Sequence, residues 1–363
     1  MIERTPKHGG QLRKISERFN IPASRLIDFS ANINPDGPPP AVLQVLRQCL
    51  EDPTTLTAYP DLEEEELKRA VAAYVGVTPQ TVVVSNGFVP LLQAALQSLN
   101  IKQCLLPVPA FVEYRRILTQ AKVRVTAHIL EAASSFSYDF DRMLSGDQDA
   151  ILLANPQNPS GVFTARASLI DFVSAAAVKN IFILLDEAFI DYLPGESLVD
   201  QVERFSNLIV FRSVTKFFAI PGLRVAYAVA GAATTRLLND HLAPWPISTL
   251  ASRAVGAAFG DSHFVDSTRT LNTRRRYDLQ AGLEALGVYV YPSAANFLLL
   301  RLPQNAQSSS FCQRAIRENH LVLRDCSNYE ALSPDHVRAA VRTERENALL
   351  VESARGILDV QEK

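Results

Sequence analysis

A series of short apolar runs, separated by segments of helix length, limits most strongly how this chain can fold. From about residue 80 onward the runs are rich in β-branched and other apolar residues, and we interpret them as free of polar alternation. Such runs are typical of strands covered on both faces, as in a mainly parallel sheet with helices on each side. They predict an α/β fold with a three-layer large domain. The runs are 81–84, 103–107, 122–129, 150–153, 181–185, 207–211 and 225–230.

The regions on either side of these runs predict a second, smaller unit. With 363 residues, the chain exceeds the length at which one core usually stops growing. Three prolines close a loop at 26–40, and they end an N-terminal arm. Beyond residue 250 a long arginine-rich helical region and apolar strands at 296–301 and 320–323 predict a smaller α+β domain. We expect an arm and part of the small domain in 1–40, the large domain in 41–250, and the small domain in 251–363.

Charge and cysteine content exclude several classes of protein. The formal net charge of −2 gives no global reason to bind nucleic acid or an anionic membrane. The four cysteines show neither close pairing nor metal-ligand spacing, so we expect reduced structural thiols and no metal site. The sequence lacks an N-terminal apolar segment and any apolar run of membrane-spanning length. We therefore expect a cytoplasmic protein.

Polar loops follow the predicted strands, at the edge where open α/β sheets bind ligands. The first is Ser85-Asn86-Gly87-Phe88-Val89-Pro90, in which Gly87 allows close backbone approach and Pro90 fits an early helical position. A helix that starts here presents free backbone N–H groups to a phosphate. An ordinary strand-to-helix turn would have the same sequence, so this loop alone does not decide the function.

Two further loops supply an amide and a carboxylate. The segment 155–161 contains two Asn-Pro units that fix a rigid loop, from which Asn158 could reach a ring oxygen. Asp186 ends an apolar strand, where burying a carboxylate is costly unless a cation lies opposite. A protonated pyridine nitrogen would be such a cation, although Asp186 could also cap a helix.

A fourth loop supplies an amine and two phosphate ligands. Lys216 lies beside Phe217 and Phe218, and an apolar environment can lower the pKa of an amine enough to make it a nucleophile. Ser213 and Arg224 flank it with a hydroxyl and a guanidinium. Each loop has an ordinary structural explanation, but together the four provide what one phosphorylated pyridine aldehyde requires.

This series of motifs resembles the fold-type I pyridoxal-phosphate enzymes of the class I/II aminotransferase family, over nearly the whole chain. The resemblance implies an aspartate-aminotransferase-like fold and pyridoxal 5'-phosphate bound to Lys216 as a Schiff base. It implies that Asp186 pairs with the ring nitrogen and that Asn158 bonds the ring hydroxyl. The expected phosphate ligands are Gly87, Phe88, Val89, Ser213 and Arg224.

Two aromatic residues extend this resemblance. Phe111, in Pro109-Ala110-Phe111, stands where the family stacks an aromatic ring on the cofactor. Tyr59, in Ala58-Tyr59-Pro60-Asp61, matches a tyrosine that reaches the cofactor phosphate of the neighbouring subunit. The resemblance therefore implies a homodimer with shared active sites.

Within the family, the sequence is most similar to the threonine-phosphate decarboxylases of cobalamin biosynthesis, with histidinol-phosphate aminotransferases as near relatives. The features that carry this are His8-Gly9-Gly10, the segments 28–35, 216–224 and 323–326, Phe189 in place of the usual tyrosine, and Arg338. The resemblance implies that Arg338 binds the substrate carboxylate. It places His8, Asn32 and Arg324 around the substrate phosphate.

The function expected from this resemblance is decarboxylation of a small phosphorylated amino acid. L-threonine O-3-phosphate would yield (R)-1-amino-2-propanol O-2-phosphate. Four positions depart from the decarboxylase pattern: Phe88-Val89 replaces a Glu-Thr pair, and Ala226 and Pro246 are unusual. They leave serine phosphate, another phospho-amino acid or a phosphonate analogue open as substrates.

Two other functions remain as alternatives. One is an aminotransferase of the histidinol-phosphate type, which would convert its cofactor to the amine form in the presence of an amino donor. The other is a non-catalytic binding protein on the same fold. Retention of a complete set of polar site residues argues against the second, because a dead site has no chemical need for them: Lys216, Asp186, Asn158, Ser213, Arg224, Arg324 and Arg338.

Overall fold

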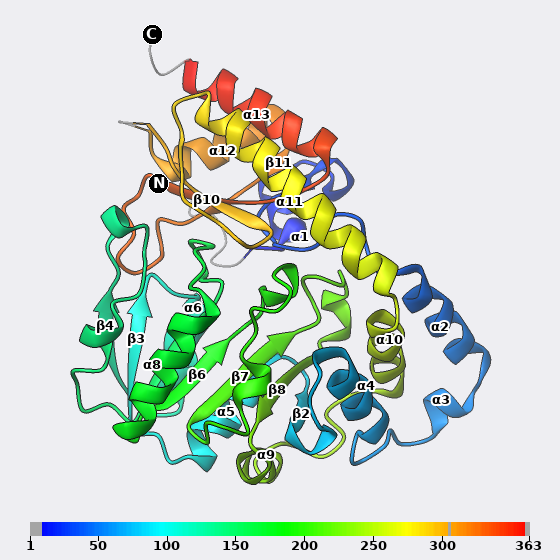
Figure 1. The fold of residues 1–363 in the computed structure, drawn as a ribbon. Coiled ribbons are helices and arrows are strands. Elements are labelled where there is room, and N and C mark those ends of the chain that lie inside the picture. Colours follow the sequence, from blue (N-terminus) through cyan, green and yellow to red (C-terminus); the bar gives the residue numbers. More distant parts are fainter. Residues whose placement is uncertain (1–8, 304–305, 360–363) are drawn as a thin grey trace.

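A seven-stranded sheet forms the centre of the large domain in the computed structural model, which describes residues 9–303 and 306–359 (Figure 1). The strands are parallel except β8, which runs antiparallel to both of its neighbours. The predicted α/β class with a mainly parallel sheet is therefore confirmed. In spatial order the strands are β2 (Val82–Ser85), β8 (Ala226–Ala230), β7 (Leu208–Ser213), β6 (Phe182–Asp186), β5 (Ala150–Ala154), β3 (Gln103–Val108) and β4 (Arg124–Ile129).

Alternating side chains of the central strands pack into two separate cores, one on each face of the sheet. Leu185 and Val210 belong to one core, and their neighbours Leu184 and Ile209 belong to the other. Because every second strand residue faces a different helical layer, apolar residues are needed at consecutive positions. The first layer comprises α2 (Pro40–Glu51), α4 (Glu65–Val75), α8 (Arg166–Val178) and α10 (Thr249–Phe259); the second comprises α5 (Phe88–Ser98), α6 (Val112–Gln120) and α9 (Ala232–Asn239).

The outermost strand, β4, differs from the expectation that all these strands are covered on both faces. Most of its side chains are exposed, and only Val125 and His128 are half-buried. Its sequence in fact alternates polar and apolar residues, with Arg124, Thr126 and His128 at every second position. Polar and charged side chains are typical of edge strands, where they discourage pairing with another chain.

The small domain has a four-stranded antiparallel sheet covered by three long helices, which Figure 1 shows above the large domain. Its sheet order is β12 (Arg324–Asp325), β13 (His336–Ala340), β10 (Phe297–Arg301) and β9 (Tyr289–Val290). Its helices are α11 (Ser262–Glu284), α12 (Ser308–Asn319) and α13 (Glu344–Asp359). Two one-turn helices, α3 (Thr54–Thr57) and α7 (Phe140–Met143), lie in loops of the large domain.

The N-terminal segment packs on the small domain. Strand β1 (Ile27–Asp28) pairs in parallel with β11 (Leu321–Val322). Helix α1 (Leu12–Phe19) buries Ile15 in a small apolar cluster with Ile316 of α12. Local sequence could not have indicated this pairing, because almost 300 residues separate the two strands.

The change from the large core to the small core takes place along α11, beyond the boundary expected at residue 250. Val265, near the start of this helix, packs into the core of the large domain. Leu279 and Leu283, near its end, belong to the core of the small domain. A continuous helix gives no compositional break, so the sequence could not indicate where one core replaces the other.

The loop after β1 joins the N-terminal arm to the segment that contains Lys216. The backbone N–H of Asn34 donates to the backbone oxygen of Lys216 at 3.0 Å, and its side-chain amide donates to the oxygen of Phe217 at 3.0 Å. The same amide donates to Thr268 Oγ1 on α11 at 3.2 Å. Asn34 therefore ties the arm, the lysine segment and α11 together.

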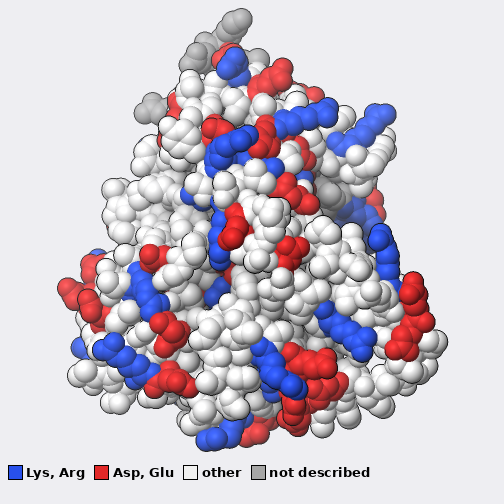
Figure 2. Space-filling view, turned by 45° about the vertical axis from the view of Figure 1, so that its right-hand side comes forward, with Lys and Arg blue, Asp and Glu red and all other residues white. Residues whose placement is uncertain are grey.

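Basic and acidic side chains are interspersed over the face shown in Figure 2, without a large area of one sign. Within 9–303 and 306–359, no helix has both the length and the apolar character needed to cross a membrane. These same ranges contain no cluster of three or more His, Cys, Asp or Glu residues suited to a metal ion.

Candidate active site

The parallel strands β5, β6 and β7 end at a cavity of about 350 Å³ that lies between the large domain, the small domain and the arm. Its volume is in the range of small-molecule sites, and its position is where ligands bind in open α/β sheets. Of the predicted site residues, the following line it: Asn32, Gly87, Phe88, Val89, Phe111, Asn158, Asp186, Ser213, Lys216, Arg224, Arg324 and Arg338.

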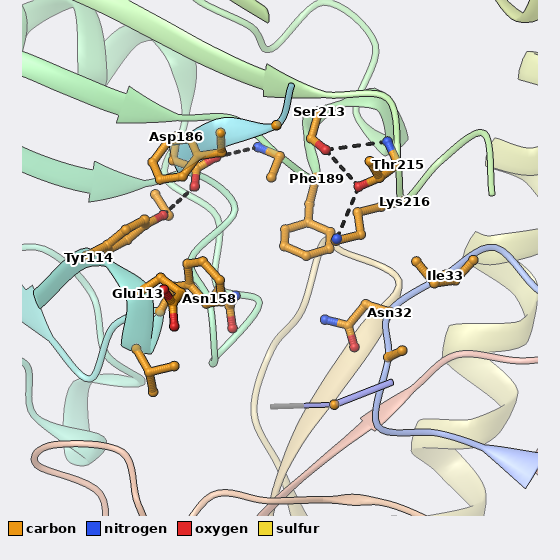
Figure 3. Close-up of a pocket in the computed structure, with 18 of the residues that line it drawn as sticks. Asn32, Ile33, Glu113, Tyr114, Asn158, Asp186, Phe189, Ser213, Thr215 and Lys216 are labelled. Carbon is orange, nitrogen blue, oxygen red and sulfur yellow. Dashed lines mark hydrogen bonds between the residues drawn. The ribbon is translucent and has the colours of Figure 1, made fainter. Parts of the chain in front are cut away.

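Lys216 projects into this cavity just after β7, and its amine lies 3.1 Å from Thr215 Oγ1, to which it donates (Figure 3). Burial, together with the nearby guanidinium groups of Arg224 and Arg338, lowers the pKa of this amine to about 8, against the opposing effect of the Asp186 carboxylate. A substantial fraction of the amine is therefore neutral and nucleophilic near neutral pH. Phe217 and Phe218 are fully buried in the large core, so they hold the backbone of Lys216 in place.

Asp186 occupies the end of β6 on the opposite side of the cavity (Figure 3). Burial raises the pKa of its carboxyl to about 6, against the opposing effect of two hydrogen bonds. One is donated by the hydroxyl of Tyr114 at 2.5 Å, and the other by the backbone N–H of Ala188 at 2.9 Å. The carboxyl is therefore mainly ionised at pH 7, and its orientation is fixed from two directions.

A third group of residues forms a cradle for an anion at the start of α5. Gly87 is the N-cap of this helix and has a φ of +87°, a conformation that favours glycine. A Cβ atom on Gly87 would lie 3.0 Å from Nη2 of Arg224, so the missing side chain also lets the guanidinium approach the helix start. Ser213 Oγ and Thr215 Oγ1 lie 2.8 Å apart nearby on the β7 side. Helix N–H groups, a guanidinium and hydroxyls together favour phosphate.

Two arginines of the small domain face each other across the cavity wall. Arg324 of β12 and Arg338 of β13 are direct partners in the antiparallel pairing. Arg338 donates to Asn158 Oδ1 at 2.7 Å and to the backbone oxygen of Ser30 at 3.1 Å. Its guanidinium lies 5.2 Å from the ring centre of Phe297. Like charges opposite each other in a strand pair are destabilising, so this arrangement favours an anionic ligand between them.

Asn158 lies next to Glu113, on the side of the cavity toward Tyr114, in the view of Figure 3. Its Oδ1 accepts from Arg338, so its NH2 group is the end that can face a ring oxygen. This hydrogen bond links Asn158, which is expected beside the cofactor, to Arg338, which is expected to bind the substrate carboxylate.

The sequence of this chain matches, over residues 24–353, the family model described as aminotransferase class I and II. It is 31% identical to a threonine-phosphate decarboxylase of Salmonella typhimurium over 357 residues, covering 97% of this chain and 96% of that protein. It is 32% identical to histidinol-phosphate aminotransferase 2 of Methylococcus capsulatus over 355 residues, covering 94% and 92%. The chain belongs to the class I and II aminotransferase family. Relatives of similar identity carry one or the other of these two activities, so family membership alone does not separate them.

The solved structures agree with the family assignment. A histidinol-phosphate aminotransferase from Clostridium acetobutylicum superposes with a TM-score of 0.86 at 26% identity, covering 92% of this chain and 99% of that one. The expected resemblance to this family, its fold and its cofactor are thereby confirmed, since class I and II aminotransferases are pyridoxal-phosphate enzymes.

Features of the pocket fit this cofactor independently of the family match. Asn32 Oδ1 and Arg338 Nε are buried without a hydrogen-bond partner within the described structure. Unsatisfied buried polar atoms are rare in folded proteins, and both belong to residues that line the cavity. The Gly87 cradle suits a phosphate, the Asp186 carboxylate suits a ring nitrogen, and the Lys216 amine suits an aldehyde.

One predicted residue, Tyr59, lies outside the pocket that this single chain forms. Tyr59 does not line the cavity; its side chain is 81% exposed, and its ring lies 4.9 Å from that of Trp245. His8 is outside the described residues. Phe111 does line the cavity, and its ring contacts Tyr114 edge-on with centres 5.5 Å apart.

Sequence reasoning assigned no role to several groups that the structure places here. Tyr114 follows Phe111 by three positions at the start of α6, so both lie on one side of the helix. This spacing could have indicated that Tyr114 lies beside Phe111. Only the folded structure shows that the Tyr114 hydroxyl donates to Asp186. Thr215 next to Lys216, and Tyr329 beside Arg324, were likewise not singled out.

A buried charged network supports the ends of β6 and β7 from behind the cavity. Arg212, one residue before Ser213, forms an ion pair with Asp191, which also accepts from the hydroxyl of Tyr74 at 2.9 Å. Burial raises the pKa of Glu187 to about 7, and this carboxyl accepts from Ser197 and from the N–H of Leu198. The network fixes the residues adjacent to Asp186 and Ser213, and Arg212 also lines the cavity.

Proposed function

We propose that this protein is a pyridoxal-phosphate-dependent decarboxylase of a small phosphorylated amino acid, with L-threonine O-3-phosphate as the first candidate. The observation that carries the proposal is the pairing of Arg324 with Arg338 at the wall of the cavity that contains Lys216. Two guanidinium groups suit a substrate with two anionic groups, a carboxylate and a phosphate.

The proposed cofactor contacts follow from the pocket. Lys216 would bind the aldehyde carbon, Asp186 the ring nitrogen, and Asn158 the ring hydroxyl, while Phe111 would lie against the ring. The phosphate would be held by Ser213, Arg224 and the backbone of Gly87, Phe88 and Val89. When bound, the cofactor supplies an electron-withdrawing ring that stabilises negative charge on the substrate Cα.

The substrate contacts would decide which bond at Cα breaks. Arg338 would hold the carboxylate, and Arg324 with Asn32 and His8 would hold the phosphate. Two fixed anchors can turn the bond to the carboxylate perpendicular to the ring, where its cleavage is favoured. CO2 then leaves, its bonding electrons remain at Cα, and the ammonium of Lys216 delivers a proton to that carbon.

A product assay tests the proposal. Purified protein, cofactor and threonine phosphate or serine phosphate are incubated, and CO2 and oxo acid are measured together. Release of CO2 without oxo acid supports the decarboxylase. Formation of oxo acid that depends on an added amino acceptor would instead support an aminotransferase. The Methylococcus aminotransferase, at 32% identity, makes this activity the second candidate.

We further propose that two copies of this chain share their active sites. Tyr59 and Trp245 form an exposed aromatic pair outside the cavity of their own chain, which suits contact with a second copy. Mixing two inactive variants tests this: Lys216→Ala and Tyr59→Ala subunits should regain activity on refolding together, because one site in each mixed dimer keeps both residues. No recovery, despite mixed dimers seen by native mass spectrometry, would contradict shared sites.

A further inference from the structure

The loop between β12 and β13, residues 326–335, places an aromatic ring directly against Arg324. Tyr329 is 5% exposed and lines the cavity, and its ring centre lies 5.0 Å from the guanidinium carbon of Arg324. The preceding residue, Asn328, accepts from Nη2 of the same arginine at 2.8 Å. Arg324 is therefore held by two consecutive residues of this loop, in addition to its own strand.

Tyr329 is itself fixed at the junction of the two domains. Its apolar neighbours include Leu130 and Phe136 from the large domain and Tyr291 and Leu299 from the small domain. Burial in a cluster of this kind restricts the ring to one orientation. The face of the ring is thereby kept toward Arg324.

An ion pair connects the same loop to the helix that carries Tyr114. Arg115 of α6 donates through Nε and Nη2 to the two carboxylate oxygens of Glu330, with both distances 2.8 Å. The two side chains are 40% and 47% exposed, so solvent screens the pair, but its two-point geometry fixes the direction of the contact. Glu330 adjoins Tyr329, so this contact sets the position of the ring relative to the cofactor side of the cavity.

We propose that Tyr329 positions Arg324 for the phosphate of the substrate, and that the Arg115–Glu330 ion pair holds Tyr329 in that place. The identity of the anion rests on the proposed function. Arg324 stands opposite Arg338 in the strand pair, and its Nη1 donates to the backbone oxygen of Asp325. The negative face of an aromatic ring attracts a guanidinium and leaves its N–H groups directed outward in the guanidinium plane, where an anion can accept them.

Tyr329 is thus a positioning residue, and a pair of substitutions separates this role from simple packing. Tyr329→Leu keeps an apolar side chain in the interdomain cluster but removes the ring face. Tyr329→Phe keeps both the ring and the packing and removes only the hydroxyl. A residue that merely fills the cluster would tolerate leucine, whereas a residue that orients Arg324 through its ring would tolerate only phenylalanine.

Steady-state kinetics of the holoenzyme with threonine phosphate provide the main test. Tyr329→Leu should raise KM about tenfold while kcat and the visible absorbance of the bound cofactor stay near those of the unchanged protein. Tyr329→Phe should retain the original KM. An unchanged KM in the leucine variant, or equal damage in both variants, would overturn the proposal.

A binding measurement tests the inference even if threonine phosphate is not turned over. Inorganic phosphate should raise the unfolding temperature of the holoenzyme, Tyr329→Leu should abolish most of that rise, and Tyr329→Phe should preserve it. Phosphate stabilisation with this pattern but no turnover would reject the proposed function and keep the inference. An equal rise in all three proteins would reject the inference alone.

Charge reversal tests the role of the ion pair. Arg115→Glu and Glu330→Arg should each raise KM for the phosphorylated substrate about threefold, and the double variant should restore it. The matched control is Arg69→Glu, which breaks a comparable exposed pair with Glu65 on α4, and should leave KM unchanged. A double variant as impaired as the single variants, or an equal effect of the control, would show that this pair does not hold Tyr329.

Discussion

The two halves of the pocket differ in how their charges are balanced. In the half built by the large domain, Lys216 and Asp186 have opposite charges, and each shifts the pKa of the other toward the ionised form. In the half built by the small domain, Arg324 and Arg338 have the same charge and face each other across paired strands. In the first half Asp186 offsets part of the positive charge of Lys216 and Arg224, whereas the second half places two guanidinium groups on directly paired strand positions. Under the proposed function, cofactor chemistry and substrate selection would fall to different domains.

The largest expected effect comes from removing the amine of the large-domain half. Lys216→Ala should lower activity by at least about 10³-fold, because both the covalent attachment point and the proposed proton donor are lost. Borohydride reduction followed by peptide mass spectrometry should find the cofactor on Lys216 in the unchanged protein. Lys179→Ala, at an exposed lysine, is the control and should keep both activity and the adduct. An adduct that persists in Lys216→Ala would move the attachment site elsewhere.

Removing the negative charge of the same half should have the next largest effect. Asp186→Asn should weaken activity about 100-fold, since the ring nitrogen loses its anionic partner while Tyr114 and Ala188 can still hold the side chain. The pKa of about 6 at Asp186 adds a pH signature: the carboxylate is present above that value, so cofactor affinity should fall as pH drops through it. Titration of bound cofactor from pH 8 to 5 measures this. An asparagine variant with the same pH dependence would assign the transition to another group.

A pH experiment links the two halves. Burial, Arg224 and Arg338 lower the pKa of Lys216 to about 8, so the neutral amine should increase about tenfold in population between pH 7 and 9. The rate at which cofactor-free protein captures pyridoxal phosphate should rise in parallel, because the neutral amine is the nucleophile. Stopped-flow absorbance follows the reaction. In Arg338→Gln the midpoint of the pH dependence should move to higher pH. A midpoint that does not move would show that Arg338 does not affect the pKa of Lys216.

The smallest effect is stabilisation of the small-domain half by an anion. Inorganic phosphate at about ten times its Kd should stabilise the protein by about 1.4 kcal/mol, which corresponds to a rise in Tm of about 2 °C. Differential scanning calorimetry measures it. Arg324→Gln relieves the repulsion of Arg338 and removes one phosphate ligand, so its Tm should no longer depend on phosphate. A retained dependence would place the bound anion in the Gly87 cradle instead.

Sequence reasoning could group the candidate residues in the large-domain half of the pocket because they follow predicted strands. Asn158, Asp186 and Lys216 all lie just after predicted apolar runs, and the ends of neighbouring parallel strands converge at one edge of the sheet. The fold class followed from the same runs, apart from the exposed edge strand β4. In each case the prediction needed only a short local pattern, an apolar run followed by a polar loop.

The small-domain half depends on contacts that no local pattern contains. No local pattern predicted the short strand β12 or β13, so the direct opposition of Arg324 and Arg338 could not be inferred from their spacing. The bond from Tyr114 to Asp186 joins residues 72 positions apart, and the Arg115–Glu330 pair joins residues 215 positions apart. The family resemblance pointed to Arg324 and Arg338. The residues that contact them, Tyr329 and Asn158, are known to do so only from the structure.

The hydrogen bonds of Asn34 have a consequence for how the arm can be manipulated. This residue donates to the backbone oxygens of both Lys216 and Phe217, so the arm supports the lysine segment as well as lining the cavity. A truncation that ends before residue 34 would keep these hydrogen bonds. A truncation that removes Asn34 would leave the lysine segment without them. Chimaeras that exchange arms between relatives should therefore be joined on the N-terminal side of Asn34 if only substrate choice is to change.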